Sequence, residues 1–211
     1  DLMTKIIRAT PAKVDQDHIR MLVDNNPHVS PRVEAIMGQG ESPGPVMAAM
    51  AKNLAKWGAD FLVIACNTAH YYFQDVVQAV QVPVLNMIEE TVKVLEKDGV
   101  QEAALLATQA ILHTKLYEKA LSLAGIRTIV PSEPYQAKVL QTIAAVKRGD
   151  FIKAQRFTDE IIKHCLDQGA QVVILGCTEL PLVFNQKGNF PITFYDPTEI
   201  VAQAIVREAL G

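Results

Sequence analysis

The chain has 211 residues, of which 49% are hydrophobic, so it is long enough to bury the core of one large domain or two modest ones. Its 20 Lys and Arg residues nearly balance 23 Asp and Glu residues, which argues against a nucleic-acid or anionic-membrane partner and favours a small soluble ligand. It shows neither a membrane-span pattern nor a signal-peptide pattern, and its 3 cysteines do not form an even disulfide set. We therefore expect a cytoplasmic protein with reduced thiols.

Short apolar runs bounded by turn residues alternate with longer amphipathic stretches, and this alternation predicts the elements. In the first half we expect helices at about 1–9, 45–57, 71–80 and 89–97, a short helix opened by Ser30-Pro31-Arg32, and strands at 19–23, 61–65 and 82–86. In the second half we expect strands at 103–107, 126–130, 171–176 and 190–196, and helices at about 111–124, 134–147, 151–167 and 197–210. Alternation of this kind predicts an α/β fold with parallel sheets and right-handed crossovers.

One pattern occurs twice. Gly58-Ala59, an apolar strand and Cys66-Asn67-Thr68 are echoed by Gly169-Ala170, an apolar strand and Cys177-Thr178-Glu179, with both cysteines 111 positions apart. The run before each cysteine lacks polar alternation, which is typical of a parallel strand covered on both faces. The chain is therefore interpreted as two copies of one unit, each with one thiol at a strand end.

The repeat predicts two pseudo-symmetric parallel-sheet α/β domains, residues 1–88 with 195–211 and residues 89–194, with the active site in the cleft between them. Shifted by the repeat length, the strand at 103–107 falls ahead of Asp1. We therefore expect a further strand and a glycine-rich turn upstream of Asp1.

The cysteine pair is the strongest chemical signal. Ligands of parallel sheets bind beyond the carboxyl ends of the strands, and a thiol there, before a helix, is expected to have a pKa lowered towards neutrality. Two such thiols on opposite sides of a small molecule suit proton removal from one face of a carbon and delivery to the other. A cysteine can also be simple packing, which is our interpretation of Cys165, and Cys66 could instead be a nucleophile with His70 as base. Cys66 and His70, four residues apart, could form half of a zinc site, but zinc is not expected because the Cys177 turn supplies no second ligand pair.

Seven polar residues lie at or just after strand or helix ends and are candidates for substrate binding. They are Arg32, Asn67, Thr68, Thr108, Lys147, Thr178 and Glu179. The Asn, Thr and Glu residues could bind the ammonium and α-carboxylate of an amino acid, or could only cap free backbone amides. The two cations could be solvated, and Lys147 could complement a helix C-terminus.

Two stretches resemble the paired signatures of the Asp/Glu racemase superfamily: residues 65–70, read as Ala-Cys-Asn-Thr-Ala-His, and residues 176–179, read as Gly-Cys-Thr-Glu. Further similar stretches lie at 25–27, 87–91 and 105–108. The resemblance implies a two-base racemase that needs no cofactor, with Cys66 and Cys177 as the catalytic pair. It also implies that Arg32 and Lys147 bind the substrate side-chain carboxylate. Glutamate racemases usually have histidine where this chain has Glu179, which favours aspartate.

We therefore expect interconversion of L- and D-aspartate by a homodimer without cofactor or metal. Two alternatives stay open: a racemase of glutamate or of many amino acids, and a protein of this fold that only binds an acidic amino acid. The chain departs from the family pattern in two places, since the glycine-rich first strand is not found ahead of Asp1 and the usual Pro-Asp-Arg is replaced by Ser30-Pro31-Arg32.

Overall fold

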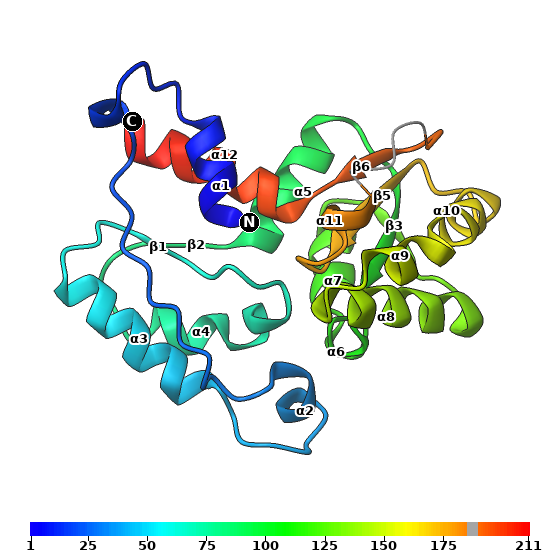
Figure 1. The fold of residues 1–211 in the computed structure, drawn as a ribbon, viewed down its shortest axis with the longest axis horizontal. Coiled ribbons are helices and arrows are strands. Elements are labelled where there is room, and N and C mark those ends of the chain that lie inside the picture. Colours follow the sequence, from blue (N-terminus) through cyan, green and yellow to red (C-terminus); the bar gives the residue numbers. More distant parts are fainter. Residues whose placement is uncertain (185–189) are drawn as a thin grey trace. The chain divides into compact units, whose positions relative to one another are not determined.

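A computed structural model describes residues 1–184 and 190–211 (Figure 1). The chain divides into two compact units. The first comprises Asp1–Glu90 with Thr198–Gly211, and the second comprises Thr91–Pro197. Among the described residues, no helix combines the length and the apolar character needed to cross a membrane.

The first unit is mainly helical around one pair of parallel strands. Its elements are α1 (Leu2–Ala9), η1 (Asp15–Asp17), α2 (Arg32–Ile36), α3 (Gly44–Lys56), β1 (Leu62–Val63), η2 (Thr68–Tyr72), α4 (Phe73–Val77), β2 (Val84–Leu85), the start of α5 (Met87–Lys97), and α12 (Pro197–Leu210). The two strands pair with Leu62 opposite Val84 and Val63 opposite Leu85.

Two apolar clusters hold the first unit together. Helices α1 and α12, from the two ends of the chain, bury Ile6 against Val201 and Ile205 (Figure 1). Helices α3 and α4 cover β1 in a second cluster, which includes Met47 and Val76. The turn after β1 is therefore carried on a strand that is packed on its α3 side.

The second unit is built on a larger sheet. Its elements are the rest of α5, β3 (Glu102–Ala107), α6 (Gln109–Thr114), α7 (Leu116–Leu123), β4 (Arg127–Ile129), α8 (Glu133–Lys147), α9 (Phe151–Ala154), η3 (Gln155–Phe157), α10 (Thr158–Asp167), β5 (Val172–Gly176), α11 (Pro181–Phe184) and β6 (Thr193–Tyr195). Within the described residues the strand order is β4-β3-β5-β6, and every pair is parallel.

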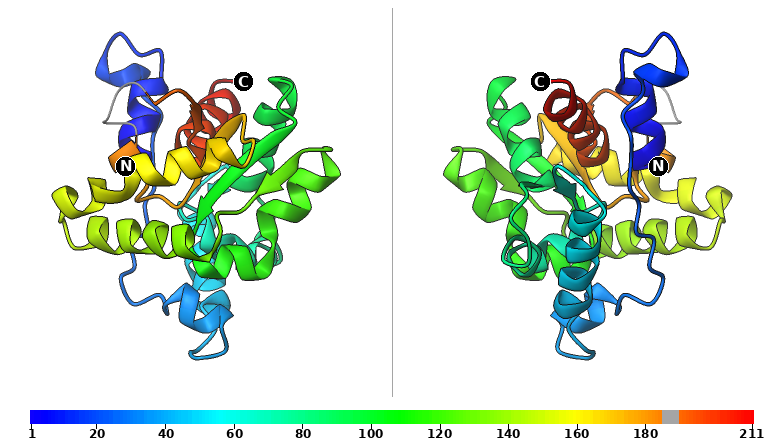
Figure 2. Two further views of the ribbon diagram at one scale, coloured as in Figure 1. Left: turned by 90° about the vertical axis from the view of Figure 1, so that its right-hand side faces the viewer. Right: turned by 90° about the vertical axis from the view of Figure 1, so that its left-hand side faces the viewer.

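Both faces of this sheet are covered, as the continuous apolar runs predicted. One face packs against α8 and α10, which lie together on one side of the sheet in Figure 1 and in the turned views of Figure 2. Leu105 and Ile174 alternate with the residues of that face, and they are equally buried. The predicted α/β class with parallel strands is confirmed.

Strands β3 and β5 form the centre of the sheet, and their carboxyl ends lie at the same edge. They pair from Ala103 opposite Val172 to Ala107 opposite Gly176. Because parallel strands end at the same edge, the residues that follow them, Thr108 and Cys177, come from neighbouring strand ends.

Three predictions about elements are wrong in detail. The helix expected at 111–124 is divided by Lys115, whose φ of 56° and ψ of 30° place it in the left-handed region. The helix expected at 151–167 is interrupted by η3. The strand expected at 19–23 is not a strand, because no ladder joins it to a neighbour in the described chain, although Ile19 and Met21 pack against the cluster formed by α1 and α12. Apolar periodicity reports which side is buried, and it does not report hydrogen-bond pairing.

Candidate active site

Cys177 lies directly beyond the carboxyl end of β5 and is only 6% exposed. The residue before it, Gly176, faces the neighbouring strand so closely that a Cβ atom there would lie 2.9 Å from the Leu105 Cδ1 atom and 3.2 Å from the Ala107 Cβ atom. Glycine is needed because β3 and β5 pack closely at this point. The backbone that carries the thiol is therefore tightly packed in the sheet.

A carboxylate folds back onto this thiol. The Cys177 Sγ atom donates a hydrogen bond to the Glu179 Oε2 atom at 2.8 Å, and the Thr178 hydroxyl donates to the same oxygen at 3.2 Å. The other oxygen, Oε1, lies 3.8 Å from the Lys147 Nζ atom. The Glu179 side chain is 21% exposed and the Lys147 side chain is 55% exposed, so the cluster opens to solvent on the lysine side.

These neighbours set the protonation state of Cys177. Burial raises the pKa of the thiol well above its ordinary value, the Glu179 carboxylate raises it further, and Lys147 opposes the shift. The expectation of a lowered pKa is thus wrong for Cys177, because the thiol is buried, an acidic side chain lies at hydrogen-bond distance, and α11 has only 4 residues. In the resting protein Cys177 is a thiol.

Two more polar residues, one from α8, lie at the end of β3. Thr108 caps α6, since its Oγ1 atom accepts a hydrogen bond from the Ile111 N–H at 3.3 Å. Gln136, in the first turn of α8, is buried and donates from Nε2 to the Ala107 carbonyl at 2.9 Å. Sequence reasoning missed Gln136. Its position one turn into the helix that follows β4 was the available signal, since that helix begins at the same sheet edge.

Cys66 lies three residues beyond β1 and is half-buried. The turn after it is compact: Asn67 and Thr68 are both buried, and η2 starts at Thr68. Asn67 has helical backbone angles, and its side chain makes no capping hydrogen bond to η2. The capping alternative therefore does not explain Asn67, whereas it does explain Thr108.

His70 connects this turn to the next helix. Its ring Nδ1 atom lies 2.9 Å from the Cys66 carbonyl oxygen, and its Nε2 atom accepts the Met87 N–H at 3.1 Å. Since both ring nitrogens are engaged by backbone groups, His70 is neither a zinc ligand nor the base for a cysteine in this arrangement.

Arg32 is the first residue of α2 and is half-buried. Its Nη1 atom approaches the carbonyl oxygens of Val29 and Ser30 at 3.4 and 3.5 Å. These are long hydrogen bonds from one nitrogen, so backbone groups occupy only a small part of its donor capacity.

The structure thus forms two local groups of the predicted site residues. Cys66, Asn67 and Thr68 share one turn of the first unit, with Arg32 elsewhere in that unit. In the second unit, contacts join Cys177 and Thr178 to Glu179, and Glu179 to Lys147.

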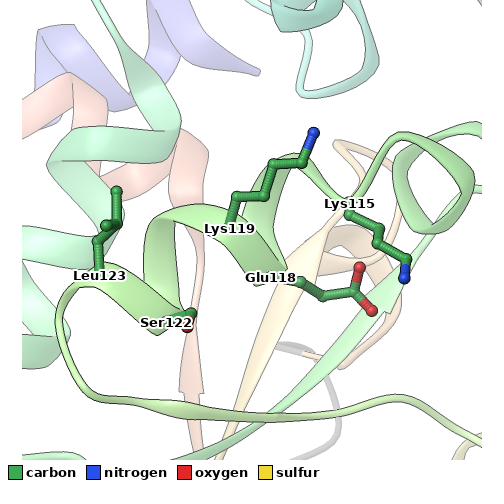
Figure 3. Close-up of a pocket in the computed structure, with 5 residues that line it drawn as sticks. All are labelled: Lys115, Glu118, Lys119, Ser122 and Leu123. Carbon is green, nitrogen blue, oxygen red and sulfur yellow. The ribbon is translucent and has the colours of Figure 1, made fainter.

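A surface depression in the second unit does not belong to either group. It is lined by Lys115, Glu118, Lys119, Ser122 and Leu123. In Figure 3 these side chains project in different directions from α7 and the residue before it, and they do not converge on one point. The depression contains none of the predicted site residues, so we give it no role in the chemistry.

A parallel α/β fold with a buried thiol beyond a strand end, beside a carboxylate and a cation, is the kind of site that an acid/base enzyme of this fold class uses. The family model for Asp/Glu/hydantoin racemase matches residues 1–205. The chain therefore belongs to the Asp/Glu/hydantoin racemase family, and it is an amino-acid racemase, an isomerase.

Individual relatives agree with this assignment. The broad-specificity amino-acid racemase RacX of Bacillus subtilis is 31% identical over 162 residues, which cover 76% of this chain and 70% of RacX. The structure of Picrophilus torridus aspartate racemase is similar with a TM-score of 0.89 and 32% identity, over 99% of this chain and 87% of that one. A glutamate racemase of Aquifex aeolicus is 30% identical over 138 residues, which cover 63% of this chain and about half (51%) of that protein.

Proposed function

We propose that this chain racemises an acidic amino acid, with aspartate as its substrate, through Cys66 and Cys177 as paired acid/base groups and without a cofactor. The observation that carries the proposal is the matched position of the two thiols. Each follows a parallel strand, in turns that share one sequence pattern. One cysteine in such a turn could be packing, whereas two in equivalent turns need a common purpose.

The proposed reaction moves one proton at each thiol. The Cys66 thiolate takes the α-proton, forming an S–H bond, and the electron pair of the broken C–H bond stays on the α-carbon and its carboxylate. The Cys177 thiol then gives its proton to the opposite face of that carbon and becomes a thiolate. Turnover of the other enantiomer reverses these roles.

The resting protonation of Cys177 supports its role as the acid in this direction. Glu179 accepts a hydrogen bond from the thiol and disfavours a second negative charge beside it. Lys147, 3.8 Å from the Glu179 Oε1 atom, reduces the repulsion when the thiolate forms. Burial and Glu179 thus keep Cys177 protonated, and Lys147 makes release of its proton easier.

The α-proton of an amino acid is very weakly acidic, so the site must stabilise the charge that develops on the α-carboxylate. We assign this role to hydrogen-bond donors from Asn67, Thr68, Thr108 and Thr178. Thr178 directs its hydroxyl to Glu179 in the structure, so substrate must displace that bond.

Arg32 and Lys147 are proposed to bind the side-chain carboxylate of the substrate. The contacts described above join Arg32 to backbone carbonyls and place Lys147 3.8 Å from the Glu179 Oε1 atom, which is longer than a hydrogen bond. Both side chains can therefore still donate to a substrate carboxylate. A cation that receives a substrate carboxylate provides a charge-assisted hydrogen bond, which favours a dicarboxylic over a neutral amino acid.

The likeness to an aspartate racemase over almost the whole chain supports aspartate. The likeness to RacX favours a second candidate, a racemase of broad specificity, at a similar identity. The two candidates differ in one measurable property, because only the first requires a side-chain carboxylate.

The test is a chiral chromatographic assay with each enantiomer of aspartate, glutamate, alanine and arginine, in pyridoxal-free buffer that contains a chelator. We expect aspartate to racemise fastest, and Cys66→Ala and Cys177→Ala each to abolish racemisation in both directions. Each variant should retain the ability to exchange the α-proton of one enantiomer with deuterium from solvent. Cys165→Ala is the matched control, since Cys165 is buried in the apolar core of the second unit and its replacement should leave turnover unchanged.

Three results would contradict the proposal. Normal racemisation by either single alanine variant would remove the two-base mechanism. Equal turnover of alanine and aspartate would replace the first candidate by the second. Activity that appears only when pyridoxal phosphate is added would remove the cofactor-independent reaction.

A further inference from the structure

The histidine that follows the Cys66 turn is not at the protein surface. His70 is 4% exposed, in the middle of η2, and its ring stacks on Phe73 with 5.8 Å between centroids and an interplanar angle of 8°. It accepts one hydrogen bond from Met87 N–H and lies at hydrogen-bond distance from the Cys66 carbonyl.

These two bonds fix the tautomer of the ring. A backbone N–H can only donate, so the Nε2 atom facing Met87 carries no proton. A neutral imidazole has its single proton on the other nitrogen, so Nδ1–H donates to the Cys66 carbonyl. The doubly protonated ring would place two donors opposite each other at Nε2. Burial lowers the pKa of His70, while its bond to the Cys66 carbonyl raises it to a smaller extent, and the lowering favours the neutral ring.

The ring therefore connects two segments that are 21 residues apart in sequence, the Cys66 turn and the first residue of α5. The Cys66 carbonyl belongs to the peptide group that joins Cys66 to Asn67. A bond to this carbonyl restrains that peptide plane, which includes the Cys66 Cα atom, and so restrains the position of the atom that carries the thiol side chain.

We propose that His70 is a positioning residue for Cys66: its Nδ1–H bond holds the Cys66–Asn67 peptide, and its Nε2 bond to Met87 holds the ring. This inference rests on the proposed function of Cys66 as an acid/base group. Proton transfer from carbon requires close alignment of the thiolate with the C–H bond, so a small rotation of this peptide lowers kcat much more than it alters substrate binding.

The two bonds can be separated by substitution, because asparagine and glutamine each reproduce one ring nitrogen. In His70→Asn the side-chain amide nitrogen takes the place of Nδ1 and can donate to the Cys66 carbonyl. In His70→Gln the amide oxygen takes the place of Nε2 and can accept the Met87 N–H. Both variants lose one buried hydrogen bond, so a purely structural role predicts similar losses of stability and of activity.

The positioning role predicts a difference between the two. We expect His70→Asn to keep kcat within about threefold of the original chain, and His70→Gln to lose kcat by about tenfold or more, with KM for aspartate changed by less than about threefold in both. Thermal unfolding followed by circular dichroism is expected to give similar midpoints for the two variants.

A matched control is available in the second unit. His164 also accepts a backbone N–H, from Ser132 at 3.2 Å, and stacks on Tyr135 with 3.9 Å between centroids, but it contacts none of the proposed site residues in the described bonds. His164→Gln should therefore leave kcat and KM unchanged.

Two outcomes overturn the inference. The first is a kcat for His70→Gln equal to that of His70→Asn. The second is a loss of kcat that parallels the decrease in unfolding midpoint across His70→Asn, His70→Gln and His164→Gln. Failure of the proposed function is recognised separately. If Cys66→Ala racemises normally, Cys66 is not an acid/base group, whatever the His70 variants do. If Cys66→Ala is inactive while both His70 variants turn over normally, only the positioning role is wrong.

Discussion

Replacing Glu179 with glutamine tests the charge that, together with burial, keeps Cys177 protonated. The substitution preserves the size of the side chain and removes its negative charge, 2.8 Å from the Cys177 Sγ atom. The raised pKa favours the thiol, so removal of the carboxylate lowers the pKa and increases the thiolate fraction near neutral pH.

The size of the change follows from the contact. A hydrogen bond to a charged group contributes about 1.5–3 kcal/mol, and a shift of one pKa unit corresponds to about 1.4 kcal/mol. The Glu179 side chain is 21% exposed, and Lys147 already offsets part of its charge, so the lower half of this range applies. We expect Glu179→Gln to lower the pKa of Cys177, because the thiol loses about 1.5–2 kcal/mol of its preference over the thiolate.

The assay is the pH dependence of alkylation of Cys177 by iodoacetamide, measured on the isolated peptide by mass spectrometry so that Cys66 and Cys165 do not contribute. The midpoint should move to lower pH in Glu179→Gln. Glu160→Gln is the control, because Glu160 also pairs with a lysine of α8, Lys138, and should leave the Cys177 midpoint unchanged.

An unchanged or raised midpoint in Glu179→Gln would refute the reasoning. Racemisation provides a second measurement. The two enantiomers are equal in free energy, so kcat/KM must fall by the same factor in both directions. If kcat changes more in one direction than in the other, KM must change by the same ratio.

Two further predictions concern substrate charge and packing. Arg32→Gln and Lys147→Gln should each raise KM for aspartate by about tenfold or more, as expected for loss of a charge-assisted hydrogen bond, and should change the free energy of unfolding by less than about 0.5 kcal/mol. Steady-state kinetics and urea unfolding measure these two quantities. An unchanged KM in both variants would remove the two cations from the site. Gly176→Ala should destabilise the second unit by about 1–3 kcal/mol, since its Cβ atom would lie 2.9 Å from the Leu105 side chain. Gly40→Ala is the control, because its Cβ atom would have no neighbour closer than 3.6 Å. Equal unfolding midpoints for the two variants would contradict the packing argument.

The parts of the fold that the sequence predicted are those that burial alone decides. The run Val172–Gly176 lacks polar alternation because both faces of the central sheet are covered, and its strand was predicted within one residue. The break at Lys115 was not predictable in this way. A single residue with positive φ divides the helix, while buried apolar residues such as Ile111 and Leu121 continue on both sides of it.

The candidate site shows the same limit at the level of chemistry. The strand pattern correctly predicted that Cys177 follows a strand end, because backbone direction is fixed by the sheet. The pKa shift was predicted with the wrong sign, because burial of the thiol raises its pKa most and the Glu179 side chain, which turns back from two residues later, raises it further. A sequence pattern fixes neither the burial of the thiol nor that rotamer. Likewise, His70 was considered as a base or metal ligand from its spacing to Cys66, whereas both of its nitrogens bind backbone groups, one of them 17 residues further along the chain. Spacing brings a side chain near a site, but the protonation state and the role of that side chain are set by long-range hydrogen-bond partners. For this reason the variants that discriminate best here change one bond or one charge at constant size, and do not remove a whole side chain.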